Sequence, residues 1–252
     1  MPNTQHALLR HVQKLNNWNP EHFTPFIISG RKVGQLKPFM VEQLQRWPRF
    51  FNIAADRVEL AEDLGFHEHN RVLEEVVREL VSRGVIAHYL EETYPVIANT
   101  RRQPLALLDR GAAGYFGIRT FGQHLNGYVK SADGLKLWVA RRAPDRIHFP
   151  NHLDNMVAGG LPQNLSLKTN LRKECHEEAG LPDALIAQAI PVGAVSYCCE
   201  TEIGIKPDTL FCYDLELPSG FEPRNTDGEV AEFMLLDVNE VLRCVRDTDA
   251  FK

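Results

Sequence analysis

The segment 159–181 constrains this chain more than any other part of its sequence. A glycine-rich turn opens it, and a helix follows that carries Glu174, Glu177 and Glu178 near its end. Basic residues come first in this helix and glutamates last, whereas the helix dipole favours acidic residues at the start and basic residues at the end. A helix selected only for stability would not carry its charges in this order.

These glutamates also lie close to one another. Spacings of three and four residues place Glu177 and Glu178 beside Glu174 on one helix face, where each like-charge pair is unfavourable by roughly a few tenths of a kcal/mol. With the dipole effect, the arrangement costs about 1 to 2 kcal/mol. Hard cations bind carboxylate oxygens, and Mg²⁺ in particular binds a few carboxylates together with substrate phosphates. We therefore expect this face to bind Mg²⁺, with Mn²⁺ as the alternative ion.

The opposite side of the helix has an ordinary apolar pattern. Leu167, Leu171 and Cys175 follow at intervals of four and form a stripe that predicts docking on a sheet. Ser166 is a suitable N-cap, and Gly180 is suited to the position just after the helix. One face of the helix is thus expected to pack and the other to bind.

The residues 173–181 closely resemble the second half of the Nudix box, which runs Arg-Glu-aliphatic-any-Glu-Glu-any-Gly-aliphatic. They read Lys-Glu-Cys-His-Glu-Glu-Ala-Gly-Leu, and Gly159 falls at the first glycine of the box. Leu165 stands where the box has its first glutamate, and Lys173 stands where it has arginine. Those two side chains commonly interact in the family. Because both are replaced here, we expect Lys173 to have no acidic partner to hold by a bidentate fork.

Further segments resemble one subgroup of the Nudix family, which is related to the hydrolase half of thiamine pyrophosphokinase fusions. The segments are 137–142, 153–160, 213–218 and 227–230. In that subgroup a different amino-terminal region precedes the catalytic domain. The resemblance implies an α/β/α sandwich with a mixed sheet, and hydrolysis of a diphosphate linkage with a divalent metal. It also implies that oxidised thiamine diphosphate analogues (the oxo and oxy forms) are cut to monophosphates.

The resemblance further assigns roles to residues of the site. It implies that Glu174, Glu177 and Glu178 hold the metal, together with a backbone carbonyl near Gly159. The general base is expected to be Glu229, because family members often place a late acidic residue over the metals, and Glu178 is the alternative. The residues just before Glu229, Asp-Gly, also read as a plain turn.

Other side chains are candidates for contacts with the substrate. Arg141 and Arg142 follow a predicted strand that would end beside the metal site, and a guanidinium fork suits an anionic phosphate. Exposed arginines at a strand end are the alternative reading of this pair. Trp138 and Tyr128 are candidates for stacking on a heteroaromatic ring, with core packing as the alternative for each.

Length and composition agree with a soluble enzyme, and we expect the protein to be cytoplasmic. The chain has 252 residues, of which 44% are hydrophobic, so it is long and apolar enough for a sizeable core. Its net charge of −5 and the lack of a Lys/Arg stripe argue against a nucleic-acid partner. The 5 cysteines show no Cys-x-x-Cys spacing, which favours reduced thiols. No signal-peptide pattern or apolar run of membrane-spanning length occurs, so we expect no membrane partner.

The order of predicted elements is that of a mixed α/β (α+β) fold in two domains, 1–118 and 119–252, with the turn-rich stretch 109–114 as the junction. The first domain is expected to pack against the second or to cover its substrate. Its predicted elements are a helix with Leu8, Leu9, Val12 and Leu15 on one face, strands at 26–29 and 51–53, and a helix at 70–83. The second domain follows with a hairpin of 123–129 and 136–141, a helix at 182–188, strands at 190–197, 209–217 and 231–236, and a helix at 238–245.

Three hypotheses about function follow. The first is a Mg²⁺-dependent hydrolase of a small organic diphosphate; within it, nucleoside diphosphate derivatives such as ADP-ribose are the alternative to the thiamine analogues. The second is a ligand sensor on a Nudix scaffold that has lost catalysis through Leu165 and Lys173. The third is a structural domain whose acidic face is merely solvated. The sequence does not define an oligomeric state.

Overall fold

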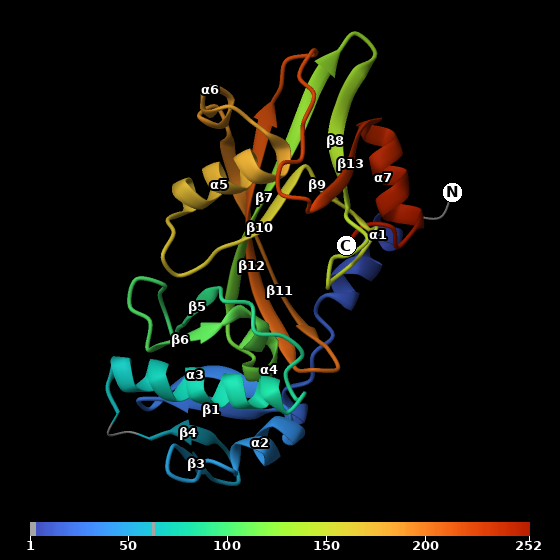
Figure 1. Ribbon diagram of the computed structural model, residues 1–252. Helices are drawn as coiled ribbons and strands as arrows, with labels where there is room; N and C mark the ends of the chain where they lie inside the picture. The colour runs from blue at the N-terminus through green and yellow to red at the C-terminus, as the bar shows by residue number, and fades with distance from the viewer. Residues whose placement is uncertain (1–3, 62–63) are drawn as a thin grey trace.

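A computed structural model describes residues 4–61 and 64–252 of the chain (Figure 1). A small sheet with its helices forms the amino-terminal part, and a larger mixed sheet forms the rest. The expected mixed α/β class is confirmed. Among the described residues, no helix has both the length and the apolar character needed to cross a bilayer.

The amino-terminal part has its own hydrophobic core. Its sheet has the strand order β2-β1-β4-β3, in which β1 and β4 are parallel. The long helix α3 (Phe66–Ser82) buries Val72, Leu73, Val76, Val77 and Leu80 in this core, which confirms the helix expected at 70–83. The other elements are η1 (Pro20–His22), β1 (Thr24–Ile28), β2 (Arg31–Leu36), α2 (Pro38–Leu44), β3 (Phe51–Ile53), β4 (Val58–Leu60), and the antiparallel pair β5 (Thr93–Val96) and β6 (Ala106–Asp109).

The larger sheet has the strand order β11-β12-β7-β8-β13, with β10 paired to β7 and β9 paired to β8. Only β12 and β7 are parallel among these described pairs, so the sheet is mixed. The expected hairpin is present as β7 and β8. The strands are β7 (Thr120–Ser131), β8 (Gly134–Arg142), β9 (Leu153–Asn155), β10 (Val157–Gly160), β11 (Ile190–Glu200), β12 (Ile205–Glu216) and β13 (Val230–Asp237).

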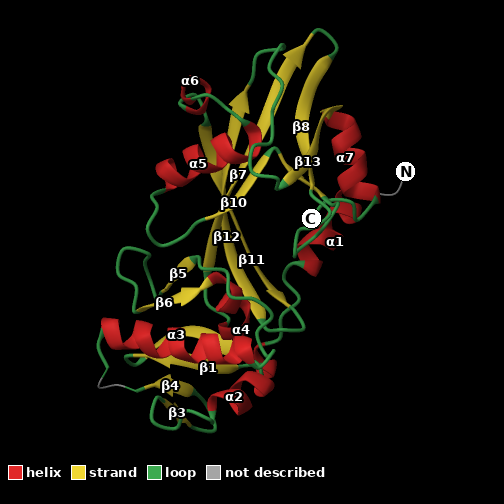
Figure 2. Ribbon diagram, in the orientation of Figure 1, coloured by secondary structure: helices red, strands yellow, loops and turns green. Residues whose placement is uncertain are grey.

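Helices cover both faces of this sheet (Figure 2). The helix α5 (Leu167–Ala179) packs on one face with Leu171 and Cys175, while α7 (Val238–Asp247) packs on the other with Val241. Trp138 joins the core under α5 and its neighbour Val139 joins the core under α7, as expected because successive strand residues point to opposite faces. The short helix α6 (Asp183–Ile186) follows α5.

The first helix lies against the last one. Arg10 of α1 (Thr4–Lys14) donates to the carbonyl of Thr248 at 2.6 Å, and His11 Nε2 lies 2.7 Å from the carbonyl oxygen of Val245. The apolar face expected to dock this helix is largely exposed, since Leu9, Val12 and Leu15 remain accessible. Polar contacts with the carboxyl-terminal segment hold α1 instead.

Three further details differ from the sequence-based expectations. Gly159 and Gly160 form the end of β10, and the turn begins only after them. The stretch 109–114 does not stay an open turn, because burial of Ala112 and Ala113 favours the short helices η2 (Arg110–Ala112) and α4 (Ala113–Phe116). Leu167 starts the apolar stripe of α5 but is 36% exposed, so the buried stripe begins one turn later.

The hairpin of β11 and β12 joins the two parts of the molecule. Its tip reaches down to the amino-terminal part (Figure 1), where Glu200 pairs with Lys37 at 3.3 Å and Ile205 is fully buried. Gly204 has φ +158°, and a Cβ at this position would collide with the carbonyl oxygen of Gly114. The tip is therefore packed too closely for a larger residue.

We expect Ile205→Ala to lower the free energy of unfolding by about 2–5 kcal/mol, because it removes buried methyl groups where the two parts meet. Ile203→Ala, at a position 38% exposed, is the matched control and should cost clearly less. Denaturant unfolding of both variants measures the difference. Equal losses would show that the burial of Ile205 between the two parts does not account for its effect on stability.

Candidate active site

The capping residues of α5 are those expected from the sequence. Ser166 Oγ accepts from the backbone N–H of Thr169 at 3.1 Å, and Gly180 takes a left-handed conformation with φ +61°. Asn170 is fully buried and ties the helix to the sheet, since its Nδ2 donates to the carbonyl of Gly160 at 2.8 Å. These contacts determine where the glutamates of the helix lie.

Two of the predicted metal ligands pack directly on β10. A Cβ at Gly159 would collide with the carboxyl group of Glu174, so glycine is needed there for this carboxylate to reach the strand. The Glu178 carboxylate accepts the backbone N–H of Ala158 at 2.8 Å and is 5% exposed. Glu177 lies further out, with 43% of its side chain exposed. The Gly159 carbonyl lies in the same strand as these contacts.

The Glu178 carboxylate lies in an unfavourable electrostatic environment. Burial is the main cause that raises its pKa to about 8; the Ala158 N–H opposes this shift, and the charges of Glu174, Glu229 and Asp154 contribute to it. Burying several carboxylates together is costly unless a cation or protons compensate them. The site therefore favours a bound positive charge.

The structure brings three predicted residues into one small pocket: Glu178, Glu229 and Arg142. Its free volume of about 10 Å³ suffices for roughly one water molecule. The full lining comprises Ala140, Arg142, Asp154, Asn155, Ala158, Glu178, Glu229 and Val230. Asp154 was not among the expected site residues; it lies at the strand β9 and pairs with Arg142 at 3.3 Å.

Glu229 is held near α5 by the loop that precedes it. The N–H of Arg224 donates to the carbonyl of Ala179 at 3.0 Å, and the N–H of Thr226 donates to that of Glu177 at 2.9 Å. These carbonyls belong to the last turn of the helix, which otherwise leaves them without partners. The chain also bends sharply at Gly228, whose φ is +87°, so the interpretation of Asp227 and Gly228 as a turn agrees with the structure.

Lys173 contradicts the expectation that it has no acidic partner. Its ammonium lies 2.8 Å from Glu177 and 3.2 Å from Glu174. The flexible lysine stem allows one ammonium to serve two carboxylates, which the sequence argument did not consider. This ion pair also offsets part of the predicted repulsion along the helix.

The donor set fits a hard cation by its chemistry, since it consists of carboxylate oxygens. Across residues 4–61 and 64–252, no three His, Cys, Asp or Glu side chains gather closely enough to hold a metal ion. Lys173 occupies the space between Glu174 and Glu177. Binding of a metal there requires this ammonium to move away.

The two predicted arginines point in different directions. Arg142 enters the small pocket, where it contacts Asp154 and donates to the carbonyl of His148 at 3.1 Å. Arg141 lies outside that pocket and pairs with Glu232 at 2.5 Å. Successive strand residues face opposite sides of a sheet, so only one of the two reaches this pocket.

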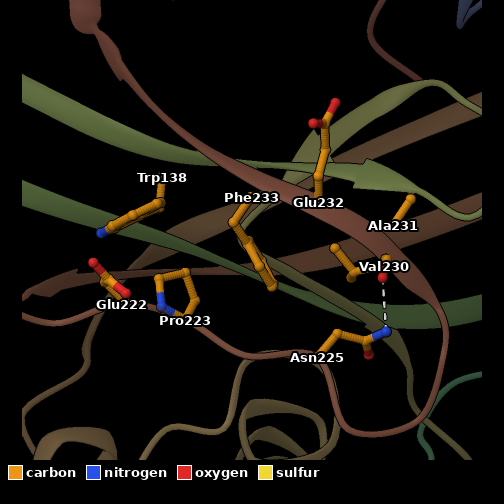
Figure 3. Close-up of a pocket in the computed structure, with 8 residues that line it drawn as sticks. All are labelled: Trp138, Glu222, Pro223, Asn225, Val230, Ala231, Glu232 and Phe233. Carbon is orange, nitrogen blue, oxygen red and sulfur yellow. Dashed lines mark hydrogen bonds between the residues drawn. The ribbon is translucent and has the colours of Figure 1, made fainter.

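Trp138 lines a second, larger pocket of about 360 Å³ (Figure 3). Trp138, Glu222 and Pro223 lie at one end of it, and Asn225, Val230 and Ala231 at the other; Glu232 and Phe233 complete the lining. The indole Nε1 is buried and has no hydrogen-bond partner among the described residues. Val230 lines both pockets, so the larger one adjoins the carboxylates.

The amino-terminal part holds the turn between β10 and α5, a contact the sequence did not reveal. Arg101 donates to the carbonyls of Leu161 and Pro162, at 3.0 and 2.8 Å. The N–H of Gln163 donates to the carbonyl of Thr93 in β5 at 2.9 Å. No local pattern marks Arg101, because its partners lie some sixty residues away in sequence.

Comparison with known proteins finds several similar chains. A model described as a domain of unknown function (DUF4743) matches residues 7–120. Nudix hydrolase 20, chloroplastic, of Arabidopsis thaliana is 39% identical over 241 residues, which cover 91% of this chain and 64% of that protein. Nudix hydrolase 24, chloroplastic, of the same plant is 38% identical over 242 residues, with the same coverage. The chain thus spans a little under two thirds of the length of both plant proteins.

A third relative is matched over more of its length. The uncharacterized protein YJR142W of Saccharomyces cerevisiae is 30% identical over 242 residues, covering 86% of this chain and 70% of that protein. Among solved structures, DR0079 from Deinococcus radiodurans aligns with a TM-score of 0.48 and 22% identity, over 64% of this chain and 93% of that one. Both plant relatives are named Nudix hydrolases, which agrees with the resemblance of residues 159–181 to the Nudix box. The thiamine-related subgroup and the cytoplasmic location stay predictions.

We expect Arg101→Met to loosen the turn 161–166, since it removes two charge-assisted hydrogen bonds worth roughly 1.5–3 kcal/mol each. Hydrogen exchange of the backbone amides in this turn should become faster. Arg102→Met, at an exposed neighbouring position, is the control for loss of charge and stem. Similar exchange in both variants would mean that the turn is held without Arg101.

Proposed function

We propose that this chain is a divalent-metal-dependent hydrolase that cleaves a small organic diphosphate to a monophosphate. The observation that carries the proposal is the meeting of Glu178, Glu229 and Arg142 in one pocket. A second pocket, lined by Trp138, adjoins it and is large enough for an organic ring. The similarity to two plant proteins named Nudix hydrolases supports the same reaction class.

In this proposal Glu174, Glu177 and Glu178 hold the metal, with the carbonyl of Gly159 as a further oxygen. A bound Mg²⁺ or Mn²⁺ neutralises charge on the phosphates and lowers the pKa of the attacking water. Lys173 pairs with Glu177 and would have to give up this pairing to a bound metal, because both cations would compete for the same carboxylates. The raised pKa of Glu178 in the absence of metal reflects the same demand for positive charge.

The remaining residues of the site have distinct roles. Glu229 accepts the proton of the attacking water, and Glu178 is the alternative base. Arg142, held by Asp154, binds a phosphate oxygen through its guanidinium. We assign Arg141 only an indirect role, because it pairs with Glu232 outside the small pocket.

The larger pocket suggests which organic group is bound. Trp138 and Phe233 offer aromatic surface, and the unpaired Nε1 of Trp138 offers a donor. Glu222 and Glu232 at the lining disfavour an anionic group and favour a neutral or cationic amino-heteroaromatic ring. The oxidised thiamine diphosphate analogues meet this requirement, and the adenine ring of ADP-ribose is the alternative.

The assay for this function combines Mg²⁺ with thiamine diphosphate, its oxo and oxy analogues, ADP-ribose and dinucleotides. We expect release of a monophosphate from at least one of them, and loss of both turnover and Mg²⁺ binding in Glu177→Gln. Circular dichroism should show that the variant is folded. Absence of turnover on every compound by folded wild-type protein would refute the proposed activity.

The ion pairs of Lys173 favour one alternative, a ligand sensor without catalysis. In that case the ammonium stays between Glu174 and Glu177 and takes the place of a metal permanently. Tight ligand binding that is independent of Mg²⁺ and is not followed by turnover would support the sensor. The buried carboxylates beside Lys173 support the enzyme instead, because one ammonium does not compensate Glu178.

Substitution of the two candidate bases should have different effects on kcat and on Mg²⁺ binding. If Glu229 is the base, Glu229→Gln lowers kcat by about 10²–10⁴-fold and leaves Mg²⁺ affinity unchanged. Glu178→Gln should instead weaken Mg²⁺ binding, because this residue is assigned to the metal. Glu240→Gln, on the exposed side of α7, is the control. A normal kcat in Glu229→Gln would transfer the role to Glu178.

A further inference from the structure

The loop that follows β8 brings an arginine to Glu229. The N–H of Ala143 donates to the carbonyl of Glu229 at 2.9 Å, so the loop starts beside that residue. The N–H of Arg146 donates to the carbonyl of Ala143 at 3.3 Å and closes a four-residue turn. Pro144 favours this turn, because its ring fixes the backbone angle that the second position requires. The turn directs Arg146 back onto Glu229, and its Nη2 lies 2.8 Å from Oε2 of the carboxylate.

Glu229 needs a partner of this kind to remain in the small pocket. That pocket contains three carboxylates, those of Asp154, Glu178 and Glu229, and their charges repel one another at short range. The side chain of Glu229 is 37% exposed. Without a partner its carboxylate would turn towards water, where it is better solvated. The ion pair with Arg146 opposes this movement.

Arg146 is itself held in place. Its side chain is 30% exposed, and its Nε is buried without a hydrogen-bond partner in the part of the chain that the structure describes. A partly buried ion pair is screened less by salt than a fully exposed one. A buried donor that stays unpaired is unfavourable, so stability alone does not account for this position of the guanidinium.

The partners of the three carboxylates differ. Asp154 pairs with Lys252 at 2.7 Å, and Glu229 pairs with Arg146. Glu178, which is assigned to the metal, accepts a backbone N–H instead. The protein thus supplies positive charge to the two carboxylates that have no assigned role as metal ligands.

We propose that Arg146 is a positioning residue, which holds the Glu229 carboxylate in the small pocket without contacting the substrate itself. The inference rests on the proposed function, in which Glu229 is the base. The ion pair engages Oε2, so Oε1 is the oxygen that takes the proton of the attacking water. A base acts only within hydrogen-bond reach of that proton, and a small displacement lowers the rate strongly. Loss of Arg146 therefore affects kcat and not KM.

NMR of the arginine Nε–H groups in the full chain tests the contact without any need for turnover. We expect the Nε–H of Arg146 to exchange with water at least about 10-fold faster in Glu229→Gln than in the wild type, because the guanidinium is then released. Glu74→Gln removes the partner of Arg78 on α3 and is the matched control. It should leave the exchange of Arg146 unchanged. An unchanged rate in Glu229→Gln would overturn the inference.

Turnover then separates positioning from substrate binding. With Mg²⁺ and either oxo-thiamine diphosphate or ADP-ribose, we expect Arg146→Gln to lower kcat by at least about 10-fold and to change KM by less than about 2-fold. In the Glu229→Gln background the same substitution should cause no further loss, because Arg146 acts through Glu229. Arg146→Lys should lose less, since it keeps the charge. Arg78→Gln, which breaks an Arg–Glu pair of 2.9 Å on α3, should keep the wild-type kcat.

Two kinetic results would contradict the inference. A raised KM with unchanged kcat in Arg146→Gln would make Arg146 a substrate contact, and a further loss in the double variant would show that it does not act through Glu229. Equal values of kcat in Arg146→Gln and Arg78→Gln would likewise exclude a positioning role. If the exchange of Arg146 depends on Glu229 but neither compound is hydrolysed, the contact stands and the proposed activity fails.

Discussion

The close approach of α5 to β10 is the contact on which the site depends. Gly159 leaves the space that Glu174 fills, Ala158 donates its N–H to Glu178, and the buried Asn170 reaches the carbonyl of Gly160. A Cβ at Gly159 would collide with the carboxyl group of Glu174 in α5, whereas a Cβ at Gly160 would collide with the hydroxyl of Tyr94 in β5. The glycines are thus required by what lies against the backbone, and neither has the positive φ of a glycine turn. The positions of α5 and of its carboxylates depend on this contact.

The same contact brings negative charges close together, and the surrounding residues compensate these charges only in part. Two carboxylates lie against the strand, where little water can solvate them, and the charge of Glu229 adds to theirs. Lys173 compensates Glu174 and Glu177 from the exposed side of the helix, whereas Glu178 has only one N–H. Stability alone would favour apolar residues at these positions, since the free energy needed to desolvate a buried charge often exceeds what its interactions contribute. The arrangement fits the proposed activity, in which these carboxylates would hold a cation beside the phosphates of the substrate.

Local features of this structure were predictable and distant contacts were not. Ser166, Gly180 and the helical period define α5, and alternating strand residues around a short turn define the β7–β8 hairpin. Only the family resemblance predicted that Glu178 and Glu229 lie together. The loop before Glu229 is held by carbonyl groups of α5, and no sequence pattern predicts these contacts. Gly159 and Gly160 were read as a turn because adjacent glycines usually are one, although here they serve close packing. The contact of Arg101 with the turn before α5 could not be predicted, because its partners Leu161 and Pro162 lie in a distant segment of the chain.

The tip of the β11–β12 hairpin has a consequence for how this protein is divided. Ile205 is sealed by the amino-terminal part, and Glu200 finds Lys37 there. A fragment that begins after residue 118 would keep the whole Nudix box and yet expose an apolar, partly unpaired strand end to water. Exposed strand ends of this kind recruit other strands and aggregate. The amino-terminal part thus covers an end of the larger sheet that would otherwise be exposed, so the second part is expected to be more soluble when it is expressed together with the first.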